Sequence, residues 1–149
     1  MQMAALPMLD PHFVKLDRLA LQKHFRHKRD VCLKRLRGMG FTVTVEPKAT
    51  FYVWLDLQGL PPPLDAGLSF FEEALKERVI VVPGVFFDIN PSSRRSLLDS
   101  PAHHYVRLSF GPKLEELERG LDGIERLLIK TYHRLKGMPE EPSASEDSK

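Results

Sequence analysis

Two long segments with helical periodicity lie toward the ends of the chain, and they constrain its fold more than any other feature. From about Phe13 to Arg37 and again after Pro112, apolar residues recur at about 3.6 residues per turn. The first stripe consists of Val14, Leu21, Phe25, Cys32, Leu36 and Met39, and the second of Leu114, Leu117, Leu121, Ile124, Leu128 and Leu135. Both segments are therefore predicted as helices that bury one face.

Between these helices, four short segments have the composition of strands. Phe41 to Val45 alternates apolar residues with Thr, and Phe51 to Leu57 alternates over a longer span. Val79 to Val82 is a β-branched run that predicts a buried strand, stopped by Pro83-Gly84. His104 to Phe110 alternates again. The sequence thus predicts two pairs of strands.

A short helix separates the two pairs, capped at its start by Asp65 or Ser69. Its expected inward residues are Leu68, Phe71, Leu75 and Val79. The order helix, strand, strand, helix, strand, strand, helix predicts an α+β fold, a two-layer sandwich in which helices cover one side of a small, mostly antiparallel or mixed sheet. We expect a lead-in at 1–12, one domain at 13–137 and a disordered tail at 138–149.

Composition excludes several classes of protein. Hydrophobic residues make up 42% of the 149 residues and charged residues 28%, which is ordinary globular usage and not that of a disordered polyelectrolyte. The longest apolar runs, such as Val79 to Val82, are far shorter than the roughly 18 to 20 residues of a membrane span. The single Cys32 makes no internal disulfide, and no signal pattern precedes Asp10-Pro11. We therefore expect a cytoplasmic protein without a membrane partner.

Arg107 is the most informative candidate for chemistry. It lies mid-strand between Val106 and Leu108, on a strand face shared with Tyr105 and Ser109. A guanidinium there is poorly placed for full solvation, and its planar fork suits bidentate binding of a carboxylate or phosphate. The alternative is a structural arginine at a sheet margin, paired with a local acid. Position alone favours this structural alternative.

Three segments in order resemble the C-terminal small domain of class I/II pyridoxal-phosphate-dependent aminotransferases of fold type I. They are Ala49 to Leu57 (ATFYVWLDL), Val79 to Phe87 (VIVVPGVFF) and Tyr105 to Phe110 (YVRLSF). The preceding helix, which leads into Phe41, is similar to the long helix before that domain's first strand. The resemblance extends from about Phe13 to Leu128 and implies the small-domain fold.

The resemblance also implies substrate-binding residues. Arg107 matches the family arginine that holds the substrate α-carboxylate, and Gly84 lies in the loop that leaves the sheet toward the active site. Phe87 matches the aromatic position after that loop. Thr50 and Tyr52 belong to the strand start that faces the substrate. The family usually has glycines after the aromatic, whereas here Asp88-Ile-Asn-Pro continues into a longer connection.

By the same resemblance the cofactor is pyridoxal phosphate, which the large domain of the family binds. The Schiff-base lysine of that domain would lie N-terminal to this chain, so no catalytic residue is assigned to any of the ten lysines here. We expect this chain alone to bind no cofactor and to be inactive. Expected partners are an amino acid or 2-oxo acid in the complete enzyme, and the large domain or a homodimer partner. The alternative is a non-catalytic remnant that acts as an interaction module through an exposed apolar patch.

Two further sequence patterns have both a structural and a functional interpretation. Nine Lys and Arg against two Asp between Lys15 and Arg37 give that segment a charge of +7, which suits a nucleic-acid footprint or, more commonly, a solvated helix face. We expect no nucleic acid, because no second basic element accompanies the segment. His24 and His27 share a helical face but have no third ligand nearby in sequence, so no metal site is expected.

Overall fold

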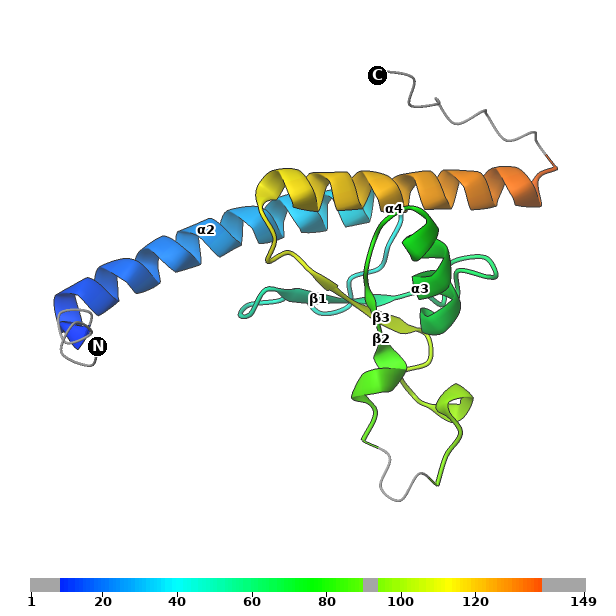
Figure 1. The fold of residues 1–149 in the computed structure, drawn as a ribbon, viewed down its shortest axis with the longest axis horizontal. Coiled ribbons are helices and arrows are strands. Elements are labelled where there is room, and N and C mark those ends of the chain that lie inside the picture. Colours follow the sequence, from blue (N-terminus) through cyan, green and yellow to red (C-terminus); the bar gives the residue numbers. More distant parts are fainter. Residues whose placement is uncertain (1–8, 90–93, 138–149) are drawn as a thin grey trace, which may run out of the picture.

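The computed structural model describes residues 9–89 and 94–137, which form three α-helices around a small sheet (Figure 1). The helices are α2 (Pro11–Gly38), α3 (Gly67–Lys76) and α4 (Leu114–Leu135). The strands are β1 (Tyr52–Asp56), β2 (Val82–Pro83) and β3 (Tyr105–Ser109), with short 3-10 helices η2 (Gly84–Phe87) and η4 (Leu97–Asp99) between the last two strands. The predicted tail at 138–149 and the first eight residues of the predicted lead-in lie outside the described residues.

The sheet is antiparallel, with the strand order β1-β3-β2. β3 is its centre, so Arg107 is paired on both sides, with Trp54 of β1 and Val82 of β2. Burial alternates along β3, because Val106 and Leu108 point into the core and the residues between them do not. This alternation confirms the strand expected at His104 to Phe110.

All three helices contribute to covering one face of the sheet, which confirms the predicted two-layer α+β fold. The C-terminal half of α2 lies beside α4, and α3 packs against β2 and β3 (Figure 1). Side chains from both layers meet in one core, including Leu36, Phe41, Val53, Leu55, Phe70, Val106, Phe110, Leu121 and Ile124. Within residues 9–89 and 94–137, no helix is long and apolar enough to cross a bilayer.

An ion-pair cluster holds α2 against α4. The Arg35 guanidinium donates to Asp122 at 2.7 Å and to Glu125 at 2.9 Å. The hydrogen bond to Asp122 raises the pKa of Arg35 above its ordinary value. The charged residues of these helices thus align the two elements, while their apolar faces supply the core.

The two halves of α2 differ in burial. Asp10 caps the helix by accepting from the backbone N–H groups of His12 and Phe13. From Lys28 onward the helix is anchored, and the predicted burial of Cys32 is confirmed, with burial raising the pKa of its thiol to about 12. The predicted burial of Val14 and Leu21 is wrong: they are 47% and 49% exposed. The reason is visible in Figure 1, where the first half of α2 extends beyond the sheet.

The strand predicted at Phe41 to Val45 is wrong. That segment makes a single bridge, from Thr42 to Asp56 at the end of β1. Phe41 is buried in the core, but Val45 is 76% exposed. Apolar alternation alone was not sufficient for a strand, because only one residue of this segment bridges to the free edge of β1.

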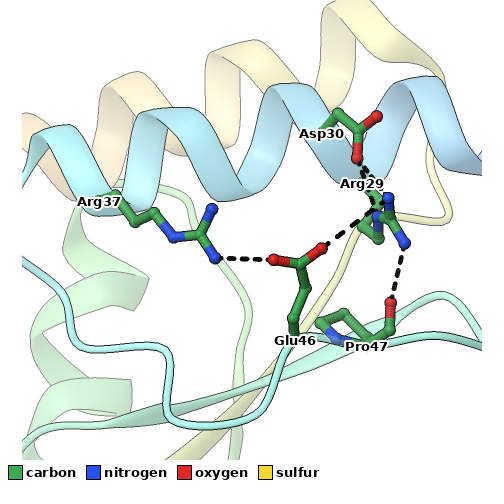
Figure 2. A network of polar contacts seen from close by, with 5 residues as sticks. All are labelled: Arg29, Asp30, Arg37, Glu46 and Pro47. Atoms are coloured by element: carbon green, nitrogen blue, oxygen red, sulfur yellow. Dashed lines mark hydrogen bonds and ion pairs between the residues drawn. The ribbon is translucent and has the colours of Figure 1, made fainter.

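A polar network attaches the same segment to α2 instead (Figure 2). The Glu46 carboxylate receives a hydrogen bond from Arg37 at 2.9 Å and lies 4.0 Å from the Arg29 guanidinium. Arg29 also donates to the carbonyl of Pro47 at 3.2 Å and to Asp30 at 2.7 Å. The basic residues of α2 in this region therefore bind this chain's own acids and carbonyls.

Three smaller expectations are corrected. The buried run at Val79 to Val82 is interrupted, because Ile80 is 76% exposed and pairing begins only at Val82. The inward face of α3 is formed by Gly67, Phe70 and Ala74, and not by Leu75, which is 43% exposed. The helix also has no side-chain cap at its start, so neither Asp65 nor Ser69 caps it.

The predicted stripe on α4 is largely confirmed. Leu117, Leu121, Ile124 and Leu128 are buried. The predicted burial of Leu135 is wrong, since this residue is 57% exposed in the last turn of the helix, beyond the residues that pack on the core.

Candidate functional site

Arg107 lies on the face of the sheet that the helices leave open. Its guanidinium carbon is 4.1 Å from the centre of the Tyr52 ring and 4.1 Å from the centre of the Phe87 ring. Contacts of a cation with ring faces contribute roughly 0.5–2 kcal/mol each, and they fix the plane of the group. Among the residues that the structure describes, no hydrogen bond or ion pair is made by this guanidinium. Its in-plane N–H donors therefore remain able to bind an anion.

Tyr52 and Phe87 reach Arg107 from different elements. Tyr52 is the first residue of β1 and pairs with Ser109, two residues along β3 from Arg107. Phe87 is the last residue of η2, which follows directly after the short edge strand β2. The sheet explains the Tyr52 contact, because side chains two positions apart in an antiparallel pair share one face. The Phe87 contact depends on the turn of η2, which carries that ring to the guanidinium.

Gly84 lies behind this cluster and permits its geometry. A Cβ atom on Gly84 would come within 2.5 Å of the Ala102 carbonyl oxygen and within 2.9 Å of Tyr105. Only glycine therefore allows η2 to turn so closely over the start of β3. This close approach carries Phe87 toward Arg107.

Thr50 lies elsewhere. Its backbone has a positive φ of 66°, and its hydroxyl accepts a hydrogen bond from the Tyr52 N–H at 3.4 Å. It borders a groove of about 690 Å³ between α2 and the segment before β1. That groove is lined by Val14, Asp17, Arg18, Leu21, Gln22, Phe25, Arg26, Arg29, Pro47, Lys48, Ala49, Phe51 and Phe110. The structure thus brings Arg107, Tyr52 and Phe87 into contact, and the close packing of Gly84 positions the turn that ends at Phe87. Thr50 contacts this cluster through the backbone of Tyr52.

Trp54 belongs to the same cluster, although the motifs did not single it out. Its ring meets the Phe87 ring edge to face, with 5.2 Å between the centroids, and the residue is 41% exposed. It is also the direct partner of Arg107 in the β1–β3 register. The period of two from Tyr52 could have indicated it, since Tyr52 and Trp54 share one face of their strand.

The comparisons with known proteins cover most of the chain. The family model for aminotransferase class I and II matches residues 1–124. A protein of Thermococcus litoralis named aromatic-amino-acid aminotransferase 2 is 33% identical over 112 residues, which cover 72% of this chain and 24% of that protein. The aspartate aminotransferase of Pyrococcus abyssi gives the same identity and coverage.

Solved structures agree with these matches. The aromatic aminotransferase of Pyrococcus horikoshii superposes with a TM-score of 0.64 at 31% identity, covering 87% of this chain and 31% of the other. This chain spans about a quarter of the length of the curated relatives that it matches.

Proposed function

Since the chain belongs to the class I and II aminotransferase family, we propose that it supplies the small-domain part of the active site of a pyridoxal-phosphate-dependent aminotransferase. In the complete enzyme, an amino group passes between an L-amino acid and a 2-oxo acid. The role of this chain is to bind the α-carboxylate that both of these molecules carry. Arg107 is the residue that makes this contact.

One observation carries the proposal: Arg107 is held in place without an acidic partner among the described residues. Two aromatic faces at 4.1 Å fix the guanidinium, and neither face uses its N–H donors. A carboxylate in the plane of the guanidinium would receive two parallel hydrogen bonds. Such a fork fixes the direction of the bound molecule as well as its position, and correct orientation is a large part of what an active site contributes. The structural alternative, an arginine paired with a local acid, is not what these residues form.

The remaining predicted site residues support this fork. Tyr52 and Phe87 fix its plane, and Gly84 allows Phe87 to come close. Thr50 accepts from the Tyr52 N–H, so we assign it an indirect role in placing that ring. None of these residues transfers a proton or forms a covalent bond in this proposal. The chain binds and orients the substrate. The catalytic groups lie in the large domain of the complete enzyme, which this chain does not span.

Family membership implies pyridoxal phosphate, which supplies an electron sink when bound. The described residues do not fit a Schiff-base site. Lys28 is the buried lysine, 3% exposed, and its ammonium group donates to the Gly111 carbonyl at 2.7 Å and lies 3.4 Å from His24. The other described lysines are exposed on helices and loops. We therefore assign cofactor binding to the large domain.

We assign the contact with that large domain, or with a second protomer, to α2. Phe13, Leu16 and Leu19 are each about half exposed on the overhanging part of the helix. Other residues of the same helix segment, among them Val14 and Leu21, line the groove described above. Apolar residues grouped in this way mark an interface. The proposed enzyme and the alternative interaction module both need this surface, whereas only the enzyme accounts for the open guanidinium of Arg107.

A chimera tests the proposal. The matching segment of the Thermococcus litoralis relative is replaced by residues 13–128 of this chain, and Arg107→Lys is then introduced. Lysine retains the charge but loses the fork. We expect the KM for the amino acid to rise about tenfold or more, since a charge-assisted hydrogen bond contributes about 1.5–3 kcal/mol. Arg119→Lys, on the exposed face of α4, is the matched control. An unchanged KM in an active chimera would remove the role assigned to Arg107.

A further inference from the structure

We propose that Trp54, together with Phe87, forms a wall that selects substrates with an aromatic or large apolar side chain. This inference rests on the proposed function, because it assumes that Arg107 holds the α-carboxylate. Family membership does not decide the side chain, since relatives of equal identity are named for aromatic amino acids and for aspartate.

The first argument is position. Trp54 and Arg107 are direct partners across the β1–β3 pair, and both point away from the helices. Paired residues in antiparallel strands lie about 4.5–5.5 Å apart. The Phe87 ring contacts both of them, at 4.1 Å from the guanidinium carbon and 5.2 Å from the Trp54 ring. A small molecule held at Arg107 by its carboxylate therefore has an indole beside it.

The second argument is the surface that remains open. Trp54 is 41% exposed and Phe87 is 39% exposed, so neither ring is buried in the core. Their edge-to-face arrangement fixes both rings and leaves apolar surface on which a further ring can stack. Most of the hydrophobic side chains of the sheet are buried; these two are exposed next to the proposed carboxylate site.

The third argument is charge. Arg107 is the only cationic residue in the three strands. The charged residues nearest along the chain to Trp54 and Phe87 are acids: Asp56, which accepts from the Tyr105 hydroxyl at 3.4 Å, and Asp88, which follows Phe87. Asp88 binds Arg95 at 2.7 Å, so that cation is already engaged. A second carboxylate on the substrate would face these acids and the rings with no cation of the sheet to receive it.

The chain provides its own probe, because Trp54 is its single tryptophan. The purified full chain is titrated with 3-phenylpropanoate, which carries a carboxylate and an aromatic ring, and separately with succinate, which carries two carboxylates. Trp54 fluorescence is excited at the red edge of its absorption, where benzene does not absorb. We expect a saturable change with 3-phenylpropanoate at about tenfold lower concentration than with succinate, the ratio that one aromatic contact supports.

Variants separate the wall from the fork. Trp54→Thr is expected to weaken 3-phenylpropanoate binding about tenfold and to leave succinate binding within about twofold, measured by ligand-observed NMR because the variant lacks the fluorophore. Phe86→Ala is the matched control, since Phe86 lies in the same turn, is 61% exposed and makes no described ring contact. Arg107→Lys is expected to weaken the binding of both 3-phenylpropanoate and succinate. Circular dichroism confirms that each variant is folded.

The outcomes distinguish the two proposals. Equal affinity for both anions, lost in Arg107→Lys but unaffected in Trp54→Thr, overturns the side-chain inference and leaves the carboxylate site standing. Absence of saturable binding, or binding that Arg107→Lys does not weaken, overturns both. Selective loss of 3-phenylpropanoate binding in Trp54→Thr supports both.

Discussion

The two faces of the three-stranded sheet carry residues with different roles. On the covered face, Val53, Leu55 and Val106 are at most 1% exposed and pack against the helices. On the open face, Trp54 is 41% exposed and Arg107 is stacked between two rings. The same alternating backbone thus holds the fold together on one side and presents recognition groups on the other. We expect substitutions on the first face to change stability and those on the second to change binding.

The largest expected effect is on the covered face. Leu55→Ala removes a fully buried side chain and should lower the free energy of unfolding by about 2–5 kcal/mol. Trp54→Ala, one residue away on the other face, should lower it by only about 1 kcal/mol despite the greater loss of volume. Urea unfolding of both variants measures the difference. Equal losses would show that the open face is also structural, and the comparison would then fail.

The next effect concerns Gly84, which connects the two faces. Gly84→Ala places a methyl group 2.5 Å from the Ala102 carbonyl oxygen, so the backbone must move. We expect a loss of about 1–3 kcal/mol, together with weaker anion binding as Phe87 shifts. Gly59→Ala is the control, because its added carbon would meet nothing within 4 Å. A Gly84→Ala variant as stable as the control would contradict the close approach described here.

A smaller effect comes from Glu77, which joins the end of α3 to α4. Burial raises the pKa of Glu77, but hydrogen bonds from Lys130 and Arg126 outweigh this and hold it below its ordinary value of 4.5. A carboxyl with a lowered folded pKa contributes stability that is present above pH 4.5 and lost as the pH falls through the lowered value.

Glu77→Gln should therefore lose about 1 kcal/mol at neutral pH and show a flatter decline of stability below that pH. Thermal unfolding across the acid range measures both. Glu118→Gln, on the exposed face of α4, controls for the loss of one charge. If the stability of Glu77→Gln declined below pH 4.5 as steeply as that of the unsubstituted protein, groups other than Glu77 would account for the loss of stability in acid.

The smallest expected change is the stability of Arg107→Lys. Its described partners are two aromatic faces and no acid, and lysine retains a cation beside those faces, so the free energy of unfolding should fall by about 1 kcal/mol or less. The same variant should lose most of its anion binding. This split between stability and binding is the sharpest form of the comparison, and a loss of stability above about 2 kcal/mol would make Arg107 a structural residue.

The sequence predicted the open face better than the packing around it. Strict alternation in Tyr105–Ser109 placed Arg107 opposite the buried Val106 and Leu108, and the structure confirms this. Alternation is local, so it can be read from a few residues. Trp54 was missed because its importance depends on its partner strand, and cross-strand register is not encoded in a single segment.

The wrong predictions share one cause, which is that tertiary contacts decide between equal local patterns. Phe41 to Val45 alternates like a strand, yet Glu46 and Pro47 attach the segment to α2. Val14 and Leu21 fall on the same helical stripe as Cys32, yet they are exposed because this part of the helix extends beyond the elements that cover Cys32. Periodicity identified which residues could be buried, but the extent of the neighbouring surface decided which residues are.

The close approaches at Gly67 and Gly84 have a consequence for how disturbances travel. A Cβ atom on either residue would collide with the carbonyl oxygen of Tyr105, at 2.5 Å for Gly67 and 2.9 Å for Gly84, so α3 and η2 both pack closely against one peptide group. The position of that peptide group therefore limits both a core helix and the turn that carries Phe87. A substitution that displaces the Tyr105 peptide group would therefore disturb α3 and the turn that carries Phe87 together.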